Sequence, residues 1–151
     1  MSPTALPAMH AAEINLVRHS FRQLLRVSAP ATALFYARLF ELAPALRPLF
    51  RGDMADQGEK LMQALALAVH SLERLATLRP AIHRLGAQHR AAGAREEHYA
   101  KVGTALLWTL EKALGADFTP ATRLAWEKTY ALFAATMIEG ARRARPIAAA
   151  A

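Results

Sequence analysis

Apolar residues recur along this chain at spacings of three and four, the period of a helix with one buried face. Three stretches show the pattern most clearly. The first stripe is Ile14, Val17, Phe21 and Leu24; the second is Gln57, Leu61, Leu65, Ala68 and Leu72; the third is Leu78, Ile82, Leu85 and His89. Runs of alternating β-branched residues are scarce, so the pattern predicts an all-α chain.

Capping residues and helix breakers predict the boundaries of about seven helices. Serine or threonine is expected to begin three of them, at Ser28, Thr77 and Thr119, and glycine to end two, at Gly93 and Gly115. The helices are expected at about 11–27, 28–42, 44–50, 54–76, 77–92, 95–114 and 119–144. Residues 1–10 and 146–151 are expected to be flexible ends of one domain over 11–145. The unequal lengths favour helices crossing around a pocket over a four-helix bundle.

Composition narrows the classes of chemistry. The chain of 151 residues has no cysteine, which excludes disulfides, Cys-ligated metals and a cysteine nucleophile. Its net charge of +7 leaves two readings open, a nucleic-acid surface or a solvated arginine-rich surface, and we expect the second, with no nucleic acid. Because no leader pattern and no membrane-spanning run is evident, a cytoplasmic protein is expected.

The six histidines do not form a pattern typical of a non-haem metal site. None are four residues apart, and no HExxH motif is present. A haem site needs less: one inward histidine, a facing polar group and an apolar pocket. His89 ends the third stripe, and its imidazole could bind either a backbone carbonyl or a metal. Gln57, Phe50, Tyr36 and Phe40 could face it.

Four segments carry a family resemblance: LFYARLFELAPALRPLF, QGEKLMQALALAV, LGAQHRAAGAREEHYAKVGTALL and AWEKTYALFA. Fourteen residues separate Tyr36 from Phe50, 28 separate Leu61 from His89, and Tyr99 follows His89 by ten. In this order the chain resembles a bacterial single-domain haemoglobin, from the group that shares its globin fold with the flavohaemoglobins. The resemblance implies a globin fold of about seven helices around haem b.

The resemblance also implies roles for individual residues. His89 would be the proximal ligand of the haem iron, and Tyr36 and Gln57 the distal polar pair, although Gln57 could point to water instead. The pocket would be lined by Phe50, Leu61, Leu85, Tyr99 and Val102. Tyr99 is expected to be a core residue in either case, with or without a hydrogen bond near the proximal histidine. Lys60 and Arg51 could pair with the haem propionates or remain exposed cations.

Two places depart from the family pattern. The stretch from Phe50 to Gln57 is shorter than in the family, so the match of Gln57 to the family's distal position rests on its separation from His89 along the chain. The glutamate expected fifteen residues after Trp126, which would support the proximal histidine, is Ala141 here. Glu139 lies two residues earlier, a rotation of about 200°, and is not expected to replace it. This departure weakens the expectation of peroxidase-like chemistry.

The function implied by the resemblance is high-affinity, reversible binding of O2, with CO and NO as further ligands. Two alternatives stay open within the haem proteins: an NO dioxygenase that uses a separate reductase, and a redox or gas sensor with a distal side chain on the iron. A haem-free helical interaction module is the third alternative. A monomer or weak dimer is expected.

Overall fold

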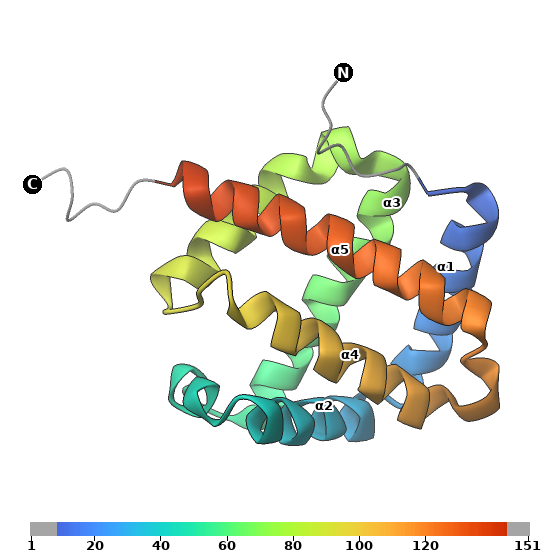
Figure 1. Cartoon of the computed structure of the whole chain (residues 1–151), viewed down its shortest axis with the longest axis horizontal. Helices are drawn as coiled ribbons and strands as arrows, with labels where there is room; N and C mark the ends of the chain where they lie inside the picture. Colours follow the sequence, from blue (N-terminus) through green and yellow to red (C-terminus); the bar gives the residue numbers. More distant parts are fainter. Residues whose placement is uncertain (1–8, 145–151) are drawn as a thin grey trace, which may run out of the picture.

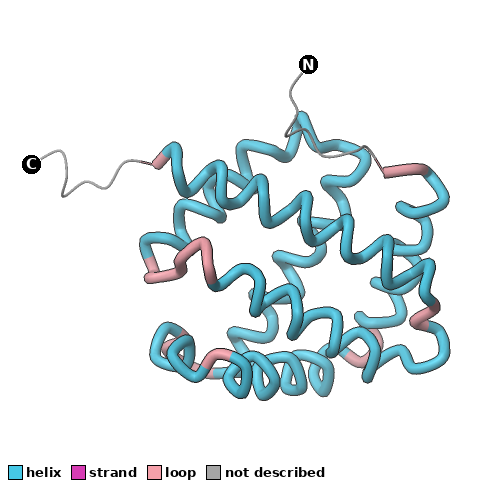
Figure 2. Tube along the Cα trace, in the orientation of Figure 1, coloured by secondary structure: helices cyan, strands magenta, loops and turns pink. Residues whose placement is uncertain are grey.

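Helices make up nearly all of the computed structural model, which describes residues 9–144 (Figures 1 and 2). The five α-helices are α1 (Ala11–Leu25), α2 (Ser28–Leu42), α3 (Met54–Ala91), α4 (His98–Leu114) and α5 (Pro120–Arg143). Two short 3-10 helices, η1 (Pro44–Leu49) and η2 (Gly115–Asp117), follow α2 and α4. No strand occurs in this part of the chain, which agrees with the all-α prediction. The predicted flexible ends lie outside the described residues, except for Met9 and His10.

Most helix boundaries lie within three residues of the prediction because local chemistry sets them. Asp53 caps α3, and its Oδ1 accepts a hydrogen bond from the amide of Ala55 at 3.0 Å. Thr119 caps α5 in the same way by accepting from the amide of Thr122 at 3.2 Å. Gly93 and Gly115 follow α3 and α4 with φ of 110° and 56°, a region that favours glycine.

The helices predicted at 54–76 and 77–92 correspond to one element, α3, which is two helices joined at a kink. The kink lies at Arg74, where φ is −139° and ψ is 39°, close to the predicted boundary. Thr77 lies inside the helix after the kink, so the prediction that it caps a helix is wrong. Pro80, inside the helix after this bend, lacks the amide that would pair with the carbonyl one turn earlier. Ser28 is likewise the first residue of α2 rather than its cap, since Val27 precedes it and makes no side-chain capping bond.

The main core lies where α1, α2, α4 and α5 meet the first half of α3. In Figure 1, α4 and α5 cross the front of the molecule and α3 passes behind them; α3 packs chiefly against α5, and α2 against α4. Trp126 is fully buried, and its Nε1 donates to Ser20 Oγ at 2.8 Å. No helix of the described residues is long and apolar enough to cross a membrane.

A second, smaller core holds α3, from Ala68 onward, against α5. It consists of Ala68, Ile82, Phe133 and Met137. Two glycines let the backbones meet: a Cβ at Gly86 would overlap the carbonyl of Met137, and one at Gly140 would overlap the backbone of His83. This contact sets the position of the last turns of α3, which carry His89.

Candidate functional site

His89 lies on the last turn of α3, and the structure exposes its imidazole. Its Nδ1 is 2.9 Å from the carbonyl oxygen of Leu85, one turn earlier. A protonated Nδ1 that donates to this carbonyl leaves the Nε2 lone pair available to a metal. The second core reaches Leu85 but not the turn beyond it, so the packed protein side chains do not cover the His89 imidazole.

Tyr36 is buried in an aromatic cluster on α2. Its ring centroid is 5.2 Å from that of Phe50 and 6.0 Å from that of Phe40. The hydroxyl donates to the backbone carbonyl of Gln57 at 2.9 Å, which ties α2 to the first turn of α3. Burial raises the pKa of Tyr36 to about 12, so the phenol keeps its proton at neutral pH and remains a donor.

The structure brings Gln57 next to Tyr36, but through its backbone rather than its amide. The Gln57 Nε2 instead donates to the carbonyl of Arg51 at 2.8 Å. Close packing of α2 on α3 explains the arrangement, since a Cβ at Gly58 would lie 2.7 Å from Thr32 Oγ1. Both side-chain donors of the expected distal pair are therefore hydrogen-bonded to backbone carbonyls.

The predicted apolar lining is half-buried. Phe50, Leu61 and Val102 pack on the main core, and Leu85 and Tyr99 pack on the second. The turn after α3 meets η1 just before Phe50, because a Cβ at Gly93 would lie 2.8 Å from Leu49 Cδ2. The end of α3, which carries His89, therefore lies close to the end of η1, which precedes Phe50.

Lys60 and Arg51 are both exposed, and neither forms an ion pair with another described residue. The pairing of these two side chains with the haem propionates stays a prediction.

On α5, the carboxylate nearest in sequence to Ala141 does not serve His89. Glu139 Oε1 is 2.6 Å from His83 Nε2 and 3.2 Å from Arg79 Nη1. The hydrogen bond from His83, with the further contribution of Arg79, holds the pKa of Glu139 below its ordinary value. This agrees with the prediction, from the rotation between positions, that Glu139 does not replace the missing glutamate.

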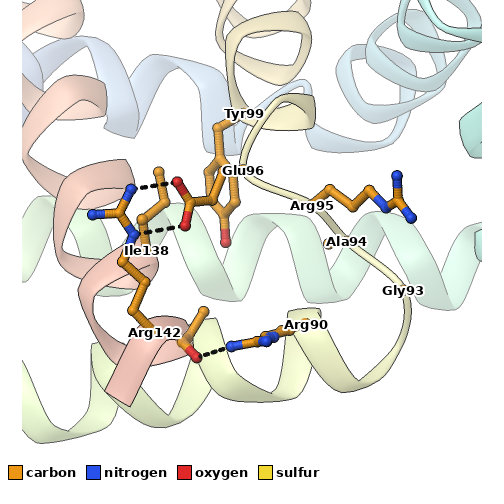
Figure 3. A pocket seen from close by; sticks show the side chains of 9 residues that line it. Arg90, Gly93, Ala94, Arg95, Glu96, Tyr99, Ile138 and Arg142 are labelled. Carbon is orange, nitrogen blue, oxygen red and sulfur yellow. Dashed lines mark hydrogen bonds and ion pairs between the residues drawn. The ribbon is translucent and has the colours of Figure 1, made fainter. Parts of the chain in front are cut away.

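Tyr99 is anchored at the start of α4. Its carbonyl accepts from the Tyr130 hydroxyl at 2.6 Å, and burial, helped by Glu96, raises the pKa of its own phenol. The carbonyl of Ala141 accepts from Arg90 Nη1 at 2.8 Å, beside Tyr99 (Figure 3).

Sequence reasoning missed the two glycines that position His89. A signal was present, because Gly86 and Gly140 stand inside helices of an alanine-rich chain, where glycine costs about 1 kcal/mol relative to alanine. The acceptor role of the Arg51 carbonyl has no such signal, since any residue supplies a carbonyl.

The donor set favours haem over a metal held by side chains alone. In the described part of the chain, no three His, Asp or Glu side chains converge on one point. The site offers one imidazole, with its Nδ1 hydrogen-bonded to a carbonyl, beside several half-buried apolar side chains. This fits haem, because the porphyrin ring itself supplies the other nitrogen ligands of the iron.

Comparison with known proteins agrees with this fit. Residues 33–137 match the globin family. The chain is 32% identical to neuroglobin-1 of Oncorhynchus mykiss over 85% of its own length and 89% of that protein's. It also superposes on a bacterial globin of Campylobacter jejuni, with a TM-score of 0.78 and 26% identity over 89% of this chain and 97% of the other.

A second similar structure is that of an engineered carbene transferase from Rhodothermus marinus, which is described as a nitric oxide dioxygenase. Its TM-score is 0.79 at 29% identity, over 89% of this chain and 94% of that one. These relatives come from vertebrates as well as bacteria, so the resemblance to bacterial single-domain haemoglobins stays a prediction. The match over residues 33–137 shows the family, which implies haem binding: the chain belongs to the globins.

Proposed function

We propose that this globin binds O2 reversibly at a haem b held by His89. The observation that carries the proposal is the 2.9 Å contact between His89 Nδ1 and the carbonyl of Leu85. This bond orients the ring, selects the tautomer with a free Nε2 and increases the basicity of that nitrogen. Haem b, when bound, supplies an iron with one coordination position open to O2, CO or NO.

Tyr36 supports the choice of O2 among these gases. Its neutral hydroxyl is fixed between α2 and α3 in an apolar cluster, where a hydrogen bond is stronger than in water. Polarised O2 accepts a hydrogen bond more readily than CO does. High O2 affinity therefore depends mainly on the Tyr36 hydroxyl, which would have to give up its hydrogen bond to the Gln57 carbonyl and donate to O2 instead. The Gln57 side chain would contribute only after breaking its hydrogen bond to the Arg51 carbonyl.

Absorption spectra test the iron ligand. The wild-type chain with hemin should show a strong Soret band that shifts on reduction and again on CO binding. His89→Ala should weaken or change that band, because the iron loses its protein ligand. His70→Ala is the matched control, an exposed histidine on the same helix. A His89→Ala spectrum identical to wild type would contradict the assignment.

A second candidate function is NO dioxygenation, favoured by the similarity to the Rhodothermus marinus protein. One NO and one O2 combine with one electron to give nitrate, so each turnover needs an electron from a separate reductase. Single-turnover mixing of NO with the reduced, O2-loaded protein should give one nitrate per haem, and Tyr36→Phe should slow the reaction. Nitrate formation no faster than in an ordinary O2 carrier would exclude this function.

A further inference from the structure

A pocket of about 560 Å³ lies between the end of α3, the turn that follows it, and the last turns of α5. Its volume is within the range of about 300–1,000 Å³ typical of small-molecule sites. Figure 3 shows Arg90 below, Tyr99 above and Arg142 to one side, with the 93–95 backbone closing the other. Tyr99 is the one lining residue that this pocket shares with the predicted haem site, and the function proposed above gives no role to Arg90, Glu96 or Arg142.

The charges around the pocket do not balance. Glu96 is paired in a bidentate manner with Arg142, at 2.7 Å from Nε and 2.6 Å from Nη2. Arg90 donates Nη1 to the neutral carbonyl of Ala141 and forms no ion pair with a described carboxylate. Arg95, also on the lining, approaches only Glu97, at 3.8 Å. The lining therefore has an excess of positive charge.

A hydroxyl donor faces the same space. The Tyr99 phenol reaches down toward Arg90 in Figure 3, and its oxygen has no hydrogen-bond partner among residues 9–144. The bond from Tyr130 to the Tyr99 carbonyl fixes the backbone that carries this phenol. Ile138 and Ala141 add apolar surface beside these donors.

We propose that this pocket binds a small organic carboxylate. The carboxylate group meets the Arg90 guanidinium and the Tyr99 hydroxyl, and the apolar body rests on Ile138 and Ala141. Guanidinium and carboxylate form strong charge-assisted hydrogen bonds, which supply the affinity. The volume and the apolar wall favour an organic acid over a small inorganic anion, which would leave most of the pocket to water.

Benzoate is the probe, and benzamide is its neutral isostere. Titrations at low ionic strength, followed by calorimetry and by amide chemical shifts, should show benzoate binding with a dissociation constant of about 1 mM or tighter. The shifts should centre on residues 93–99 and 138–142. Using the reduced, CO-saturated protein keeps benzoate from the iron, and repeating the titration without hemin separates this site from the haem proposal.

Three variants carry the test. Arg90→Gln should weaken benzoate about tenfold or more, because the neutral amide loses the charge. Arg84→Gln, an exposed arginine on the same helix outside the pocket, should leave binding unchanged. Glu96→Gln should strengthen binding about threefold or more, since it removes the competing carboxylate; loss of folding cannot imitate this gain.

The outcomes are distinct. Weaker binding in Arg90→Gln together with tighter binding in Glu96→Gln supports the proposal. If Arg90→Gln does not fold, the gain in Glu96→Gln and the failure of benzamide to bind decide in its favour. Equal binding of benzamide, unchanged affinity in both variants, or no benzoate binding to the wild type would each overturn it.

Discussion

The Tyr36 hydroxyl has one proton, and in this structure it uses that proton in a hydrogen bond to the carbonyl of Gln57. Tyr36→Phe keeps the ring in its aromatic cluster and removes only the donor. We expect the O2 dissociation rate to rise about tenfold or more, because a hydrogen bond to a charged acceptor contributes about 1.5–3 kcal/mol. CO dissociation, followed in the same flash or stopped-flow experiment, should change much less. An unchanged O2 rate would show that Tyr36 is not the donor.

The three tyrosines of the chain should all resist ionisation in the folded state. Burial raises the pKa of Tyr36 to about 12 and is also the main cause of the raised pKa of Tyr99 and Tyr130. Their contribution to stability is complete below the unfolded pKa of about 10 and is lost as pH rises through the folded values, because the unfolded chain releases protons first.

Tyrosinate absorbance tests this prediction. Near pH 10 the folded protein should show much less tyrosinate than the same chain in urea, and the urea midpoint should fall as pH increases further. Tyr36→Phe should reduce that fall. Ordinary ionisation near pH 10 with the helical circular dichroism signal intact would contradict the prediction.

At the scale of helices, the contact between α3 and α5 depends on glycine at two positions. Gly86→Ala places a methyl group against the fixed backbone of Met137, so we expect a loss of about 1–3 kcal/mol in the free energy of unfolding. Gly58→Ala is the matched comparison, because its new methyl meets only the side chain of Thr32. A small shift of Thr32, at the cost of its hydrogen bond to the carbonyl of Ala29, and the higher helix propensity of alanine should make its effect smaller than that of Gly86→Ala.

Urea denaturation of the two variants measures the difference. Gly86→Ala should have a lower midpoint than Gly58→Ala, with similar slopes. Equal midpoints would show that the backbones of α3 and α5 are free to separate, and the position of His89 would then be less strictly determined than the structure indicates.

For the whole molecule, haem binding and folding should be coupled. A ligand that binds only the native state at 100 times its dissociation constant adds about 2.7 kcal/mol, which corresponds to a rise of about 5–10 °C in Tm for a domain of this size. Hemin should therefore raise the Tm of the wild type and of His70→Ala by similar amounts. His89→Ala should show a much smaller rise. No rise in the wild type would contradict the haem assignment.

Most of the fold could be predicted from the sequence because its determinants are local. The caps at Asp53 and Thr119 join residues two or three positions apart, and the helix ends at Gly93 and Gly115 depend on one backbone angle each. The four segments that carry the family resemblance predicted a globin fold, and the match over residues 33–137 then showed the globin family.

The sequence by itself therefore determined the all-α class, nearly all helix limits and the family. Only the tertiary structure decided that α3 bends at Arg74 and continues through Thr77, that the second core stops one turn before His89, and that Tyr36 donates to the backbone of Gln57. The physical reason is that these features depend on how α3 packs against α2 and α5, whose residues are distant in the chain. Periodicity shows which face of a helix is apolar, but only packing shows how far the partner surface extends and which acceptor each donor meets.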